Sequence, residues 1–152
     1  MNIAGTSTSN NPVLVKYDAS GTAQWAKTIT GGTGSAEFRA VAVDGSGNVY
    51  AAGSQYGTGN YNYGTVSIPV NIAGACTNGN PVLVKYNASG TALRVETITA
   101  GTASASFKAV AVNGSGIVYA AGYQSAGNFN YGSGTLAGTS ATENPVLVKY
   151  WN

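Results

Sequence analysis

Short apolar runs separated by glycine-rich turns recur along this chain. The segment 38–44 (FRAVAVD) is followed by Gly45-Ser46-Gly47 and then by 48–55 (NVYAAGSQ). This order predicts a strand, a tight turn and a second strand, because glycine supplies the positive φ that a reversal needs. We expect Asp44 to open the turn by accepting backbone N–H bonds. No apolar stripe with a 3.6-residue period is present, and β-branched residues and glycines interrupt every window, so the pattern disfavours helix.

The same pattern predicts four strands in each unit of the chain. In the complete unit they are the segments 38–44, 48–55, 81–86 and 91–99. An insert at 56–79, rich in Tyr, Gly and Asn, separates the second strand from the third. We expect the four strands of a unit to form one antiparallel sheet.

The chain contains internal sequence repeats. The heptapeptide NPVLVKY occurs at 11–17, 80–86 and 144–150, and 33 of 45 positions are identical when 11–55 is laid over 80–124. Repetition of this kind indicates stacked units that cannot bury their faces alone. The 152 residues therefore form a single repeat array, with a partial unit at 1–37, a full unit at 38–106 and a partial unit at 107–152.

Residue size predicts how the strands of a unit are arranged. The first two strands carry the small residues Ala40, Ala42, Ala51, Ala52 and Gly53, whereas the third carries larger residues such as Val82. Small residues at one edge suit the crowded axis of a propeller, and apolar residues on both faces of the third strand suit a sheet lying between other sheets. We expect Ala40 and Ala109 to lie nearer a shared axis than Val82 and Val146. The predicted fold class is all-β, with propeller-type repeats forming about two four-stranded antiparallel blades plus overhanging strands.

Two segments, AVAVDGSGNVYAAG and NPVLVKYDASGTAQWAKTI, carry a resemblance to a known family. They resemble the bacterial seven-bladed β-propeller repeat (SBBP) family and, more loosely, NHL repeats. The resemblance covers nearly the whole chain and implies a propeller blade, with little implied about function beyond a scaffold in secreted or surface proteins. The second unit departs from the motif, since Asn87 and Asn113 stand where the first has Asp18 and Asp44.

Composition excludes several classes of function. Charged residues make up 8% of the chain and the net charge is +2, so no clustered basic field is present for nucleic acid. No apolar run approaches the ~20 residues of a membrane helix, and residues 1–5 show no signal-peptide pattern. The low charge and the many Gly, Thr, Asn and Tyr residues favour a place outside the cytoplasm or on the cell surface.

Candidate catalytic chemistry is sparse. The chain has no His, and its one cysteine, Cys76, corresponds to Ser7 and Ser140 in the other repeats, which suits a small loop residue. Each Asp-x-Ser-Gly turn holds a single carboxylate, whereas a calcium site needs several. The five acids are scattered and are not paired in both repeats. We therefore expect no enzyme, no metal and no cofactor.

The inserts hold the one candidate ligand site. The motifs GNYNYG (59–64) and GNFNYG (127–132) alternate asparagine with an aromatic residue, so in a strand the rings share one face. Rings that stack on sugars, with amides that bond hydroxyls, predict a glycan site. The alternative is that the rings cover the side of a blade or a neighbouring subunit. The candidate residues are Asn60, Tyr61, Asn62, Tyr63, Asn128, Phe129, Asn130 and Tyr131.

Two units are too few to close a propeller, which needs ~4–8 blades. The predicted strand order leaves free edges, and free edges attract other strands. We expect the chain to pair with copies of itself or with the remainder of a longer propeller, and three or four copies would give six or eight blades. The predicted function is a structural or interaction scaffold that assembles into a closed ring. The alternatives are a glycan-binding module and the subunit of an open filament.

Overall fold

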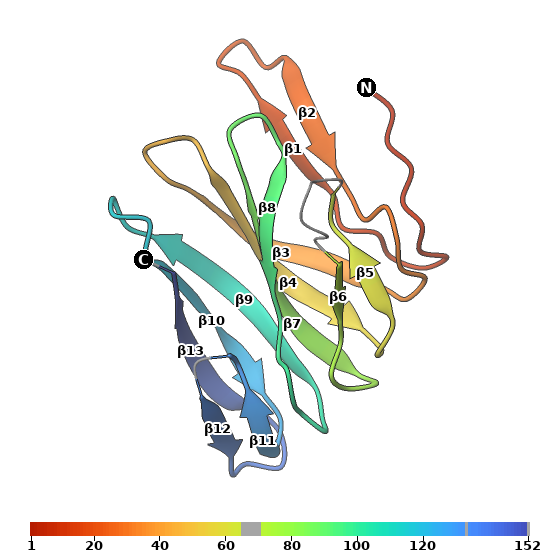
Figure 1. The fold of residues 1–152 in the computed structure, drawn as a ribbon, viewed down its shortest axis with the longest axis vertical. Coiled ribbons are helices and arrows are strands. Elements are labelled where there is room, and N and C mark those ends of the chain that lie inside the picture. Colours follow the sequence, from red (N-terminus) through yellow and green to blue (C-terminus); the bar gives the residue numbers. More distant parts are fainter. Residues whose placement is uncertain (65–70, 133, 152) are drawn as a thin grey trace.

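The computed structural model describes residues 1–64, 71–132 and 134–151, and all regular structure within these ranges is β (Figure 1). Residues 65–70 of the predicted insert, with 133 and 152, lie outside the described part. The strands are β1 (Leu14–Tyr17), β2 (Ala23–Lys27), β3 (Ala36–Val43), β4 (Val49–Tyr56), β5 (Asn60–Asn62), β6 (Asn71–Ala73), β7 (Gly79–Tyr86), β8 (Ala92–Glu96), β9 (Ala105–Val112), β10 (Val118–Gln124), β11 (Gly127–Asn130), β12 (Thr135–Gly138) and β13 (Asn144–Tyr150).

A four-stranded antiparallel sheet, the central sheet, lies in the middle of the chain in the order β3-β4-β7-β8. These are the four strands predicted for the complete unit, with bounds shifted by a few residues. Within the sheet Ala52 pairs with Ala40 on one side and with Leu83 on the other. The prediction of one antiparallel sheet per complete unit is confirmed.

The partial units flank the central sheet. Strands β1 and β2 form the N-terminal hairpin, and β9, β10 and β13 form the C-terminal sheet in the order β13-β10-β9. Two further hairpins, β5-β6 and β11-β12, arise from the inserts. Figure 1 shows the N-terminal hairpin, the central sheet and the C-terminal sheet one after another in chain order. The all-β fold is confirmed. The described sheets form an open row, and the shared axis expected near Ala40 and Ala109 stays a prediction.

The turns contain the predicted side-chain hydrogen bonds and a glycine with a positive φ. The Asp44 carboxylate accepts N–H bonds from Ser46 and Asn48, each at 2.9 Å, and Gly47 has a φ of 78°. Asn113 makes the matching bonds in the second unit, where Gly116 also has a φ of 78°. Asparagine can replace aspartate in the turn because a single side-chain oxygen makes both backbone bonds.

Two apolar clusters bury both faces of the central sheet. One lies against the N-terminal hairpin and includes Ile29, Val82 and Val84. The other lies against the C-terminal sheet and includes Leu83 and Phe107. Strand β7 is consequently buried along almost its whole length, which confirms the expectation that the third strand lies between two sheets.

Trp25 lies in β2, the strand that corresponds to the outer strand β8, where Arg94 holds the matching position. Although this is an outer strand, Trp25 is only 8% exposed. It packs on Tyr86 with ring centroids 6.3 Å apart, and its Nε1 donates to the Ala88 carbonyl at 3.1 Å. The indole occupies the space over the glycine turn of the next unit, which the sequence of one strand does not reveal.

Candidate functional site

The aromatic residues of the two inserts point into the protein. Tyr61 and Phe129 lie in β5 and β11, and Tyr63 and Tyr131 follow these strands directly. None of the four side chains is more than 2% exposed. The hairpins β5-β6 and β11-β12 thus cover the sides of their sheets with buried rings, as the second interpretation of the inserts predicts.

A buried glutamine anchors each hairpin to its sheet. Tyr63 donates its hydroxyl to Oε1 of Gln55 at 2.9 Å, and Gln55 donates Nε2 to the Ile72 carbonyl at 3.2 Å. In the second unit Tyr131 bonds Gln124 at 3.0 Å, and Gln124 bonds the Leu136 carbonyl at 3.1 Å. Sequence reasoning missed both glutamines. The available signal was their identical place at the end of the second strand in both repeats.

The asparagines of the inserts have two separate roles. Asn62 and Asn130 accept a bond from the backbone N–H two residues later, at 2.9 and 2.8 Å, and so shape the turn. Asn60 and Asn128 are exposed. The glycan interpretation needs exposed pairs of rings beside exposed amides. The structure exposes two of the amides but buries the rings, because they complete the apolar side of each sheet.

Burial also changes the chemistry of the tyrosines. Desolvation raises the pKa of Tyr63 well above its ordinary value, with a smaller contribution from Tyr86, and desolvation raises the pKa of Tyr86 and Tyr131 as well. Desolvation, together with the hydrogen bond to Asp44, raises the pKa of Tyr50 to about 12. These hydroxyls remain protonated donors and serve as structural groups.

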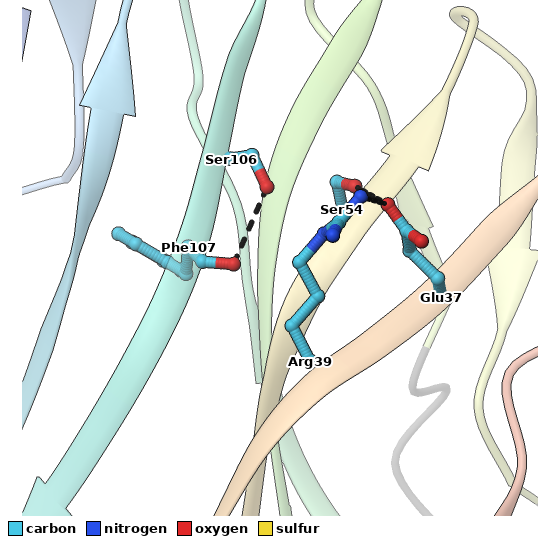
Figure 2. A network of polar contacts seen from close by, with 5 residues as sticks. All are labelled: Glu37, Arg39, Ser54, Ser106 and Phe107. Carbon is cyan, nitrogen blue, oxygen red and sulfur yellow. Dashed lines mark hydrogen bonds and ion pairs between the residues drawn. The ribbon is translucent and has the colours of Figure 1, made fainter.

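A polar cluster lies between the central sheet and the C-terminal sheet. Figure 2 shows Glu37, Arg39 and Ser54 on β3 and β4, opposite Ser106 on β9. Glu37 forms an ion pair with Arg39 and accepts a bond from Ser54 at 3.2 Å. In the second unit the positions of Arg39 and Ser54 hold Lys108 and Tyr123, which make a cation–π contact of 5.1 Å instead. One interaction thus replaces the other, and Glu37 has a structural partner.

The carboxylate of Asp44 uses both of its oxygens in hydrogen bonds. Besides its two N–H bonds, Asp44 accepts bonds from the Asn48 amide at 2.8 Å and the Tyr50 hydroxyl at 3.0 Å. Partial burial acts to raise the pKa of Asp44, but bonds from Asn48, Tyr50 and Ser46 together lower it below its ordinary value.

Among the described residues no group of three or more His, Cys, Asp or Glu side chains gathers as a metal site would require. The same part of the chain holds no helix that is long and apolar enough to cross a membrane.

The most distinctive surface is the outer face of the C-terminal sheet, here called the open face. Tyr119 pairs with Lys149 and Ala121 with Leu147, so these four residues lie on one face. Tyr119 is 39% and Leu147 is 66% exposed. The corresponding residues of the central sheet, Tyr50 and Leu83, are both 0% exposed because the C-terminal sheet covers them.

A second apolar surface lies on the central sheet, on the face that is turned towards the N-terminal hairpin. Val41 and Val43 of β3, here called the exposed valine pair, are 54% and 59% exposed. Their counterparts Val110 and Val112 in β9 are half-buried against the central sheet. The two exposed surfaces are therefore the two sides of a contact that the chain already makes once, between its central and C-terminal sheets.

No model of a protein family matches the chain, and no curated protein is similar to it. The resemblance to the bacterial seven-bladed repeat thus rests on the residues quoted for it.

Proposed function

We propose that this protein is a structural or interaction scaffold built of propeller-type blades, and that its copies associate through the open face. The observation that carries this proposal is the exposure of Leu147 beside Tyr119, where the same positions of the preceding sheet are fully buried. Contiguous exposed apolar residues on a sheet face are a feature of interaction surfaces. The uncovered partner surface, the exposed valine pair, lies on the same chain.

A head-to-tail contact of this kind repeats from copy to copy. Such a contact closes into a ring if the rotation per copy divides the circle, and otherwise extends as a filament. Each copy supplies about two blades, so three copies would give six blades and four would give eight, within the ~4–8 found in propellers. We favour the closed ring, because closure leaves no sheet face uncovered.

We also propose that the scaffold works outside the cytoplasm or on the cell surface. The support is compositional: charged residues are only 8% of the chain, and glycine accounts for 22 residues. Fractionation of the source cells, followed by detection with an antibody, tests the location. Recovery in the cytoplasmic fraction alone would contradict it.

A charge placed on the open face tests the association. In Leu147→Lys the lysine would have to be desolvated in the contact, so light scattering across a dilution series should show association at least about tenfold weaker than that of the unchanged chain. Leu93→Lys is the matched control, because Leu93 is 42% exposed but lies in β8, away from the open face. Equal association of both variants would overturn the proposal, as would an unchanged chain that stays monomeric.

A further inference from the structure

We infer that association includes an exchange of strands, in which β13 of one copy takes the place of β1 beside β2 of the next copy. This inference rests on the proposed function and names the contact that would join the copies. The resulting sheet would contain β9, β10 and β13 from one copy and β2 from the other, in the strand order of the central sheet.

The first observation is that β1 and β13 are interchangeable partners for β2. Both belong to the same heptapeptide, NPVLVKY, at 11–17 and 144–150. Leu14 pairs with Lys27 and Lys16 with Trp25 in the N-terminal hairpin. By the repeat, Leu147 and Lys149 would meet the same two residues. Strand β2 would therefore exchange one ladder for another of identical sequence, at little net cost.

The second observation is that β1 is shorter than β13 and has fewer paired residues. Only Leu14–Tyr17 of its heptapeptide form a strand, and among the described residues this strand pairs with β2 alone. The equivalent heptapeptide in β13 is paired with β10 along its whole length, from Asn144 to Tyr150. The outer edge of β13 carries no described strand, although the matching edge of β7 carries β8. Between two copies, β1 is consequently the strand that leaves and β13 the strand that takes its place.

The third observation is that the exchange covers both exposed surfaces at once. The exposed valine pair is uncovered because, among the described residues, the N-terminal sheet holds only β1 and β2, the counterparts of β7 and β8. Strands β9 and β10 of another copy correspond to the first two strands of a unit, and their open face carries Tyr119 and Ala121. Inside the chain Tyr50 and Ala52, at the same repeat positions, already lie in the cluster that packs against Val110 and Val112. The partner that fits this surface is therefore a second copy of the chain.

Strand exchange also gives the third copy of the heptapeptide a role. If β13 fills the place beside β2, residues 1–17 are released as an arm. Both β1 and β13 correspond to the third strand of a unit, so after the exchange each contact between copies contains β13 but not β1. Domain swapping of this type creates an interface from contacts that the monomer already contains.

Paired cysteines test the exchange in the full chain, with Cys76→Ser as background because serine stands at the equivalent positions 7 and 140. Directly opposed residues of antiparallel strands have Cα atoms about 4.5–5.5 Å apart, within the range that a disulfide spans. The test variant carries Leu147→Cys with Lys27→Cys. The matched control carries Leu14→Cys with Lys27→Cys, which closes a disulfide inside one chain and locks β1 in place.

After oxidation, the test variant should run on a non-reducing gel as multiples of the 15.2 kDa chain, and reduction should return it to one chain. The locked control should run as one chain and should lose association in light scattering until reductant is added. A locked control that associates as well oxidised as reduced would overturn the exchange while leaving the proposed function intact. Absence of association in the reduced forms and in the background chain would overturn both.

Discussion

Leu83 and Leu147 occupy the same position of an identical heptapeptide, yet Leu83 is 0% exposed and Leu147 is 66% exposed. Leu83 lies in β7 against the C-terminal sheet, whereas Leu147 lies in β13 on the open face. Because the strands have the same sequence, the difference arises from the stacking of sheets. The proposed association of copies depends on this difference between the two leucines.

The two leucines should respond differently to truncation. Leu83→Ala removes a side chain from a packed cluster and should lower the free energy of unfolding by about 2–5 kcal/mol. Leu147→Ala should change it by less than about 0.5 kcal/mol at concentrations where the protein is monomeric. Chemical denaturation at a fixed low concentration measures both. Equal losses would mean that Leu147 is packed inside the monomer.

The turns allow a matched test of backbone strain. Gly114 and Gly116 lie in one turn, and a β-carbon at either position would meet open space, but only Gly116 has a positive φ, 78°. Gly116→Val should therefore destabilise by about 1–3 kcal/mol, because a β-branched residue is strained in that region. Gly114→Val should cost distinctly less. Thermal melts of the two variants compare them, and equal melting temperatures would contradict the assigned role of Gly116.

The buried tyrosine–glutamine pairs should stabilise the insert hairpins. Tyr63→Phe leaves Oε1 of Gln55 without its donor inside the protein, so we expect a loss of about 1–3 kcal/mol. Tyr131→Phe should cost a similar amount, since Gln124 makes the same bond. Tyr17→Phe serves as the control, because Tyr17 is 60% exposed. Urea unfolding measures all three, and losses no larger than that of the control would show that the bonds contribute nothing net.

Alkaline pH should destabilise the fold. Burial raises the pKa of Tyr63 and Tyr86 above the ordinary value of 10.0, and the pKa of Tyr50 to about 12. A raised pKa means that the folded state holds the proton more tightly. The stability is thus complete below about pH 10 and is lost as the pH rises through 10 towards the folded-state values.

Absorbance of tyrosinate and circular dichroism, recorded together in one titration, measure this effect. We expect the buried tyrosines to ionise only as the β signal is lost. Ionisation of all ten tyrosines near pH 10 with the β signal intact would contradict the burial of the hydroxyls of Tyr50, Tyr63 and Tyr86.

The local structure could be predicted from the sequence because its causes are local. The glycine turns opened by Asp44 and Asn113, the four strands of the complete unit and their antiparallel order all follow from short-range pattern and repeat alignment. The alternation of asparagine and aromatic residues in the inserts also placed the rings correctly on one face.

What could not be predicted depends on contacts between distant segments. The direction in which the ring face of Tyr61 and Tyr63 points is decided by the neighbouring sheet, and the pattern is the same for a buried or an exposed face. The burial of Trp25 depends in the same way on the turn of the next unit. The role of Gln55 was missed because a glutamine at a strand end has no distinctive local pattern.

The central claim is that copies of this chain join through the open face and close into a ring. Native mass spectrometry of the unchanged protein, across a dilution series in the micromolar range, tests it most directly. We predict one discrete species of three or four chains, each of 15.2 kDa, that loses mass only as whole chains on dilution. A monodisperse monomer with an intact β signal at every concentration would contradict the claim, and an unlimited ladder of masses would identify an open filament in place of the ring.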